Sequence, residues 1–549
     1  MKKIKSVIAI LLLFALVLSL ERISATADSD LTSTDSSAIS SSLTSDSVGD
    51  LNYLIKDEVV FPHDEVVDVN IEFSEGIYDE MMANAINKEY VVADITYNGN
   101  TLYNIAVRPK GNSSLQQVAM SDDNRVSLKV DFNKYVDNQN LYGITKLNLN
   151  NIFSDPSLLA EYLGYEMLDD VGAVAPDTTY ISLSINGKFF GLYLAVEEVD
   201  ENFLQIAYGN SDGELYKPEM GIGSDLNYIS DDPDDYVGIS PKDDKMTTDE
   251  NYIELVTTID KIIANNGETE EYNLSNILNV DSFLSYLAFS SATIHLDAYQ
   301  SGMNHNYYLY FNTDTELFEW IAWDLNMIFN GFPMSNLTDE EATAFLIDEP
   351  VIGEMSKYPL VQAIFTNDEY VEIYHKYLEE LTTNYLSQDK FEEKVTSAYT
   401  MIESYASSDP SAFYTISEVK ESIYNDDKNV TELSLLNFVE LRVANLTKQL
   451  TGEILSTNDG AGNTGSGMGK GNQAGMMPPE GMDVQEGMMP PEGMMPPEGM
   501  MPPEGMAMQG DKGKNVTVSS NLEIEDIASL IICLAITGSL VLYLGLRKH

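Results

Sequence analysis

The sequence predicts an α+β protein with a strand-rich N-terminal part, a helical C-terminal part and a C-terminal transmembrane helix. Between residues 67 and 132, apolar and polar side chains alternate, which is the pattern of half-buried strands. From residue 331 to about residue 455, most of the chain follows a helical pattern. Residues 527–546 form an uncharged apolar run, which is long enough to cross a hydrocarbon core of ordinary thickness.

Both ends of the chain carry signals for the secretory route. Three lysines precede an apolar run from residue 7 to 20, and Ala25-Thr26-Ala27 offers small residues for cleavage, so we interpret residues 1–27 as a signal peptide. An uncleaved anchor is the alternative. Residues 547–549, Arg-Lys-His, are typical of a cytoplasmic tail. The sequence therefore predicts a single-pass cell-surface protein with its bulk outside.

Charge and cysteine content exclude several classes of function. Lys plus Arg total 30 against 88 Asp plus Glu, for a formal net charge of −58. Nucleic acid is therefore excluded as a partner, because its binding requires cations that neutralise phosphates. The single cysteine, Cys533, lies inside the apolar run. The outer part can thus form no disulfide and no thiolate metal site.

Composition divides the chain between these ends. Residues 28–50 are rich in Ser, Thr and Asp and are interpreted as a linker. Residues 51–455 have the patterns of one globular unit. Residues 456–526 are rich in Gly, Met, Pro and Glu, with EGMMPP repeats, and we interpret them as a stalk. Methionine thioethers also bind Cu(I), so metal handling by this tract remains an alternative to a plain spacer.

The elements of the globular unit follow in order. VVDVNIEF, YVVADITYNG, YNIAVRPKG and VSLKVDF read as strands, with Asn98-Gly99 as a turn. Residues 157–170 have apolar residues at helical spacing. A hairpin with Asn186-Gly187 as its turn follows, and then helices at about 249–265 and 280–294. An aromatic-rich hairpin turns at residues 312–314 and returns the chain to Asp324.

This last hairpin carries the strongest functional hypothesis. Because a hairpin brings its two ends together, it places Asp324 beside the loop that holds Asp297 and the asparagines 304 and 306. Phosphoryl transfer needs a carboxylate to orient a hydroxyl and oxygen ligands for a divalent ion. Protein kinases have the same order of His-x-Asp, Asn, hairpin and Asp. As an isolated motif, the same residues also fit helix caps and tight turns.

Five ordered blocks make the pattern more specific: VRPKGNSS, KLNLNNIFSDPSLL, FFGLYLAVEEVDENFL, ELYKPE and NHNYYLY…WIAWDLN. Together they resemble the CotH family of spore-coat kinases and their secreted relatives, over about residues 67–450. The resemblance implies an atypical, two-lobed kinase-like fold. It also implies transfer of phosphate from ATP, with Mg²⁺ or Mn²⁺, to Ser or Thr hydroxyls of surface or coat proteins.

The resemblance also implies roles for individual residues. Asp297 matches the catalytic aspartate and Asp324 the metal-binding one, while Asn304 or Asn306 supplies a further metal ligand. Lys129 is expected to bind ATP phosphates as a point charge, and either Glu161 or Glu197 is expected to pair with it. The remaining candidates are Lys110 and Gly111 for phosphate contact and three aromatic residues for adenine: Tyr142, Phe318 and Trp320. The histidines at 63, 305 and 375 are expected to be structural or exposed.

Two departures from the family pattern leave a second hypothesis open. Ala160 and Tyr162 stand where many relatives have basic residues, and Asn326 replaces the second aspartate of the usual Trp-Asp-x-Asp. An amide oxygen still ligates Mg²⁺, so Asn326 stays a candidate metal ligand. The alternative function is a surface scaffold or adhesion protein that keeps the fold without catalysis.

Overall fold

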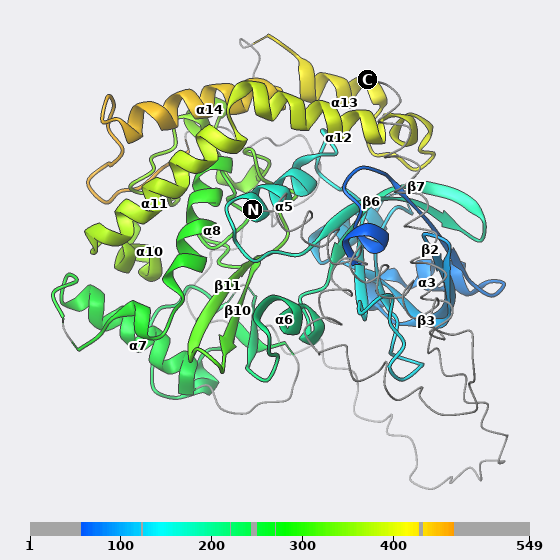
Figure 1. Cartoon of the computed structure of the whole chain (residues 1–549), viewed down its shortest axis with the longest axis horizontal. Helices are drawn as coiled ribbons and strands as arrows, with labels where there is room; N and C mark the ends of the chain where they lie inside the picture. The colour runs from blue at the N-terminus through cyan, green and yellow to red at the C-terminus, as the bar shows by residue number, and fades with distance from the viewer. Residues whose placement is uncertain are drawn as a thin grey trace, which may run out of the picture. The chain divides into compact units, whose positions relative to one another are not determined.

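The computed structural model describes residues 56–465, apart from 122–123, 220, 243–249, 270 and 428–431. The expected signal peptide, the linker, most of the stalk and the apolar run at 527–546 lie outside this range. In the described part of the chain, no helix has both the length and the apolar character needed to cross a bilayer. Figure 1 shows a strand-rich N-terminal part in blue and a helical C-terminal part in green and yellow, as the sequence predicts.

The N-terminal part is a closed barrel of seven strands in the order β1-β2-β3-β4-β5-β7-β6. A parallel pairing of β1 with β6 closes it, and every other pairing is antiparallel. The strands are β1 (Val67–Glu72), β2 (Val91–Tyr97), β3 (Asn100–Lys110), β4 (Ser127–Asp131), β5 (Lys146–Asn150), β6 (Thr178–Ile185) and β7 (Lys188–Glu197). Closure leaves this sheet without an exposed edge.

Alternation along β3, β4 and β5 separates the barrel interior from a polar outer face. Leu128 on β4 pairs with Leu149 on β5, and both belong to the interior core. Lys129 pairs with Asn148, one residue further along each strand. Since successive side chains point to opposite faces, Lys129 and Asn148 lie outside the barrel. Lys110, two residues from the Lys129 partner Arg108, shares this outer face.

A second sheet, in the order β11-β10-β8-β9, belongs to the helical part. It consists of β8 (Leu215–Pro218), β9 (Ile239–Pro241), β10 (Tyr307–Asn312) and β11 (Leu317–Ala322). The β10–β11 pair is the predicted aromatic hairpin, with Tyr307 opposite Ala322 at its open end. Trp320 stacks on Tyr307 with ring centroids 4.0 Å apart, so this hairpin anchors the adjoining core.

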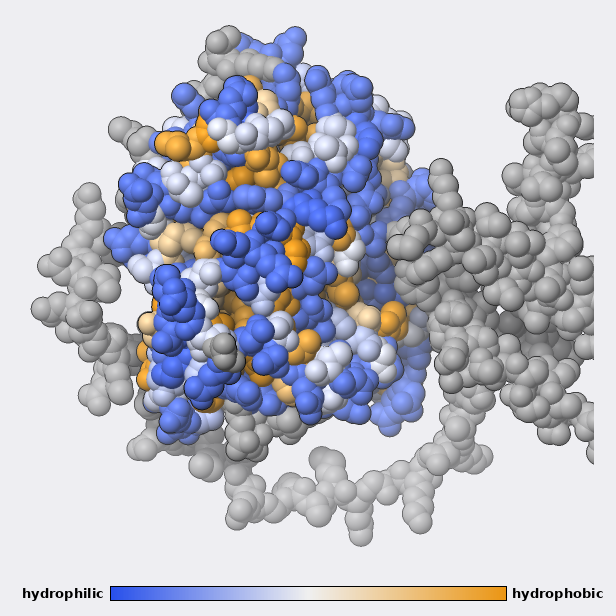
Figure 2. Space-filling model, turned by 60° about the vertical axis from the view of Figure 1, so that its left-hand side comes forward, coloured by the Kyte–Doolittle hydropathy of each residue, from blue (hydrophilic) through white to orange (hydrophobic). Residues whose placement is uncertain are grey.

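Helices cover this sheet and form the rest of the C-terminal part (Figure 1). The α-helices of the described residues are α3 (Ile77–Ala83), α4 (Ser113–Ala119), α5 (Ala160–Asp170), α6 (Glu201–Tyr208), α7 (Glu250–Ala264), α8 (Val280–Thr293), α9 (Asp339–Thr343), α10 (Pro359–Ile364), α11 (Asp368–Glu380), α12 (Gln388–Ser408), α13 (Ile416–Tyr424) and α14 (Leu435–Leu450). Hydrophilic residues dominate the face in Figure 2, with hydrophobic ones between them in small groups. That surface suits a strongly acidic chain.

Both predicted Asn-Gly turns are confirmed. Asn98 and Gly99 have φ of 46° and 77°, and Asn186 and Gly187 have 51° and 73°. Such left-handed pairs match the twist of a two-residue hairpin, and asparagine and glycine tolerate them best.

Two boundaries differ from the prediction. Helix α5 begins at Ala160, three residues after Ser157, because the buried Asp155 carboxylate accepts from the Ser157 and Ala160 amides and holds a turn there. At the other end, hydrogen bonds continue beyond residue 455. The carboxylate of Glu349 accepts from the backbone amides of residues 458, 460 and 462. The packed unit therefore extends into the segment that the sequence assigns to the stalk.

A buried ion pair joins the barrel to the helical part. Arg125, just before β4, contacts Asp409 after α12 at 2.7 Å, and both side chains are at most 3% exposed. The Asp409 carboxylate also accepts from the Leu192 amide on β7. Gly191 lies against this pair, and a Cβ there would stand 2.4 Å from the Arg125 guanidinium. We call Arg125, Asp409 and Gly191 the interlobe clamp.

Candidate active site

The β10–β11 hairpin brings Asp297 and Asp324 into one neighbourhood. At the open end of the hairpin, the Trp323 amide donates to the Asn306 carbonyl, so the residue before Asp324 is tied to the loop after Asp297. The pKa of the Asp324 carboxyl is raised, chiefly by burial, while the charge of Lys110 opposes this and that of Asp297 adds to it. The hairpin thus holds the loop after Asp297 beside the residue that precedes Asp324, as the sequence predicted.

Two neighbours hold the Asp297 carboxylate. The Asn306 amide donates to its Oδ2 at 3.2 Å and to its backbone carbonyl at 2.8 Å. His305 Nε2 lies 3.2 Å from Oδ1. Burial alone would lower the pKa of His305, but the contact with Asp297 raises it above its ordinary value. His305 was expected to be structural or exposed, and the structure instead places it against the candidate catalytic carboxylate.

The two asparagines before the hairpin differ in what they contact. With its amide oriented to satisfy its neighbours, Asn304 donates to the carbonyls of Ser301 and Tyr299, at 3.0 Å each, and so stabilises its own loop. Asn306 faces Asp297, and its amide nitrogen makes the contacts described above. Both have positive φ, 47° and 61°. Of the two, the structure places Asn306 beside the Asp297 carboxylate.

Helix α5 contributes a second acidic side chain, that of Glu161, which interacts electrostatically with Asp324. Glu161 is 4% exposed, and burial together with the charge of Asp324 raises its pKa to about 8. Tyr165, one helical turn further, accepts a hydrogen bond through its hydroxyl from the Asp324 amide at 3.2 Å. Asp324 itself has φ of 59°, a left-handed conformation uncommon for aspartate. Its backbone is thus held by a side chain of α5.

Lys110 at the end of β3 is the lysine that interacts with these carboxylates. Burial lowers the pKa of its ammonium group, while the charges of Asp324 and Glu161 act in the opposite direction. Its Nζ donates to Asn150 Oδ1 at 2.9 Å, and the Asn150 amide nitrogen lies 2.9 Å from both oxygens of Glu161. Lys110 and Glu161 are therefore connected through an amide that the sequence did not single out.

The expected pairing of Lys129 with Glu161 or Glu197 is wrong. Lys129 contacts Glu198 at 2.7 Å, and Lys242 contacts the same carboxylate oxygen at 2.6 Å. Burial lowers the pKa of Lys129 to about 8, with Glu198 opposing and Lys242 adding to this. Glu197, one residue earlier on the opposite side of the strand, contacts Lys56 at 2.8 Å instead. The alternation along β7 decides which of the two adjacent glutamates meets the outer lysines.

The remaining candidates are scattered around this centre. Gly111 has φ of 103°, and a Cβ there would lie 2.8 Å from Ser114 Oγ, so the turn after Lys110 requires glycine. Asn326 donates to the Phe153 carbonyl at 3.1 Å. Trp320 and Phe318 are packed into the core at 2% and 0% exposure, so their rings are not presented to a nucleotide. Tyr142 is partly buried and donates to Asn100.

The residues present fit a divalent cation. The Asp324 carboxylate accepts no hydrogen bond from any described residue, although it is buried enough for its pKa to be raised. Glu161 beside it is also buried with a raised pKa. Two carboxylates that repel each other, one of them buried and the other partly buried, are stabilised by a bound cation. The described residues hold no cluster of three His, Cys, Asp or Glu that meets metal-binding spacing, so amide oxygens such as that of Asn306 are needed to complete a ligand set.

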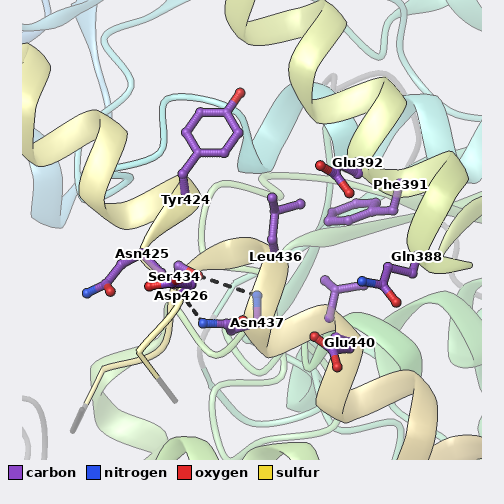
Figure 3. Close-up of a pocket in the computed structure, with 11 residues that line it drawn as sticks. Gln388, Phe391, Glu392, Tyr424, Asn425, Asp426, Ser434, Leu436, Asn437 and Glu440 are labelled. Carbon is purple, nitrogen blue, oxygen red and sulfur yellow. Dashed lines mark hydrogen bonds between the residues drawn. The ribbon is translucent and has the colours of Figure 1, made fainter. Parts of the chain in front are cut away.

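Two cavities lie apart from these residues. One of about 160 Å³ is formed by α12 and the α13–α14 connection, where Ser434 and Asn437 donate to the Asn425 carbonyl (Figure 3). The other, about 760 Å³, is lined mainly by α12, together with Tyr162 and Glu166 of α5. Neither is lined by Asp297, Asp324 or Lys110. The candidate site is therefore defined by its side-chain contacts.

Comparison with known proteins identifies the family of the chain. The family model described as CotH kinase protein matches residues 107–446, more than half of the chain. The chain is also 26% identical over 272 residues to Inner spore coat protein H of Bacillus subtilis (strain 168). That alignment covers 49% of this chain and 70% of the relative. The matched range contains Lys110, Asp297 and Asp324.

Proposed function

The chain belongs to the CotH kinase family, and from this and the site geometry we propose that it is a metal-dependent protein kinase. It transfers the γ-phosphoryl group of ATP to Ser or Thr hydroxyls of surface or coat proteins. The observation that carries the proposal is that Lys110 of the barrel lies 5.5 Å from the ring of Trp323, next to Asp324, where the hairpin meets the loop that holds Asp297. Kinase sites need these three kinds of group together.

Each group has a role in this proposal. Asp297, held by His305 and Asn306, orients the acceptor hydroxyl and receives its proton. Lys110 donates to phosphate oxygens as a point charge. Asp324 and Asn306 are the residues that hold Mg²⁺ or Mn²⁺, with Asn304 and Asn326 as further amides in the same segment. When bound, the ion neutralises phosphate charge.

Phosphate transfer from labelled ATP to a mixture of cell-surface and coat proteins tests the proposal. The purified full-length chain is incubated with ATP and either Mn²⁺ or Mg²⁺, and label is followed on each protein. We expect Asp324→Asn to lower transfer by about 100-fold or more, since it removes a charge that the ion needs. Asp297→Asn is expected to lower kcat by about 10²- to 10⁴-fold with little change in KM for ATP.

Asp314→Asn is a matched control, because it makes the same substitution at the far turn of the same hairpin, where Asp314 contacts Asn210. Transfer should stay within about twofold of the unaltered chain. Transfer that survives Asp324→Asn would exclude the proposed site. A complete lack of transfer with any acceptor favours the scaffold alternative. That alternative is suggested by Asn326, which replaces the second aspartate of the family pattern.

We further propose that the chain acts at the cell surface, anchored by residues 527–546 after removal of residues 1–27. The support is the sequence pattern and the coat location in the name of the Bacillus subtilis relative. Protease treatment of intact cells tests this. Digestion of the folded unit, with an epitope after residue 546 protected inside the cell, is the expected result.

A further inference from the structure

The contact between Lys110 and Glu161 is indirect, and it has a defined polarity. Asn150 Oδ1 accepts from Lys110 Nζ at 2.9 Å, and Asn150 Nδ2 lies 2.9 Å from each carboxylate oxygen of Glu161. The carbonyl end of the amide therefore faces a cation and its amino end faces a carboxylate. Only one orientation of the amide satisfies both neighbours.

The bridge formed by Asn150 is buried, and the backbones on both sides of it are fixed. Asn150 is 9% exposed and Glu161 is 4% exposed, so water can replace few of the hydrogen bonds between them. Asn150 is the last residue of β5, in register with Leu194 of β7, and the barrel fixes its backbone. Glu161 is in the first turn of α5. A buried amide in this position holds a barrel strand and a helix at one spacing.

We propose that Asn150 is a positioning residue, which sets where the Lys110 ammonium group lies relative to Glu161 and hence to the phosphates of ATP. This inference rests on the proposed function. Hydrogen bonds to charged groups in buried sites are strong, and a displaced lysine loses its alignment with the phosphates. Asn150 itself touches neither reacting group.

A charge exchange tests the bridge. Asn150→Asp alone replaces the amide that donates to Glu161 with a second acidic side chain and is expected to lower kcat/KM for ATP by about 10- to 100-fold. In the double variant Asn150→Asp with Glu161→Gln, the acid and the amide exchange places, so the new carboxylate accepts from Lys110 and from the new side-chain amide on α5. We expect the Asp substitution to cost at least about tenfold less in this background than in the unaltered chain. An equal cost in both backgrounds overturns the proposal.

A second readout does not depend on catalysis. Without nucleotide, acylation of Lys110 by a succinimidyl ester is measured by mass spectrometry. Asn150→Leu removes its acceptor and should raise the rate by about tenfold, whereas Asn150→Asp pairs with the ammonium group and should lower it. Equal rates in all three chains would show that the bridge does not hold Lys110.

Two comparisons keep the outcomes separate. Asn138→Asp adds the same charge at an exposed position of the β4–β5 connection and should change neither readout. Urea unfolding of every variant shows whether it is folded. If Lys110 labelling responds as expected but the unaltered chain transfers no phosphate, the proposed function fails and the positioning role fails with it. If transfer occurs and the charge exchange does not rescue it, only the role of Asn150 is lost.

Discussion

Removal of the Asp409 carboxylate is expected to destabilise the folded chain by about 3–5 kcal/mol, because Asp409→Ala leaves the Arg125 guanidinium buried without a counter-charge. Both side chains of this pair are at most 3% exposed, so solvent screening is small. The Leu192 amide loses its acceptor as well. At an unfolding entropy of about 0.8 kcal/mol per kelvin for a unit of this size, the loss corresponds to a fall in Tm of about 4–6 °C.

Urea unfolding gives the free energy, with two signals that report different parts. The two tryptophans, Trp320 and Trp323, lie on or just after β11, so their fluorescence reports the helical part. Far-ultraviolet circular dichroism reports both parts. Because the clamp joins barrel and helices, we expect the two transitions to coincide in the unaltered chain and to separate in Asp409→Ala.

Two further variants isolate the cause. Arg125→Met with Asp409→Leu removes both charges and should be less destabilising than Asp409→Ala alone. Gly191→Ala keeps both charges but places a methyl group 2.4 Å from the guanidinium, so it should also weaken the clamp. A loss under about 1 kcal/mol for Asp409→Ala, or a double variant as unstable as the single one, would refute the reasoning.

Two predictions concern other parts of the chain. His295 is fully buried, neither ring nitrogen has a hydrogen-bond partner in the described residues, and burial lowers its pKa to about 4. The unfolded chain therefore binds a proton between about pH 6.5 and 4 that the folded chain does not, so stability is lost as pH falls through this window. His295→Phe should remove up to about 3 kcal/mol of this loss, at 1.36 kcal/mol per pKa unit, in urea unfolding at pH 7 and pH 4; equal pH dependence in both chains would contradict it. Glu349→Ala removes the acceptor for three backbone amides between residues 458 and 462. Limited proteolysis should then cut that segment several times faster, and an unchanged rate would show that the carboxylate does not hold it.

Much of the local structure was predictable because it depends on neighbours in sequence. The alternation of apolar and polar residues predicted β1 to β4, and the Asn-Gly pairs predicted both two-residue turns. The hairpin between Asp297 and Asp324 follows the same logic, since its register depends on one short turn. Barrel closure was not predictable, because the parallel pairing of β1 with β6 joins strands more than 100 residues apart. The sequence period shows that a strand has two faces and says nothing of which strand lies beside it.

The candidate site shows the same difference between contacts within one segment, which were predictable, and contacts between distant segments, which were not. The sequence by itself predicted that Asp297, one of the asparagines 304 and 306, and Asp324 lie together, because one hairpin connects them. Only the structure shows that Asn306 is the asparagine in contact with Asp297. It chose the wrong partners for Lys129, because Glu197 and Glu198 differ by one position and only the register of β7 against β5 decides which faces outward. Asn150 and His305 gained their importance from neighbours on other elements. Contacts between distant segments depend on how the barrel and helices pack, and that packing is a property of the tertiary structure alone.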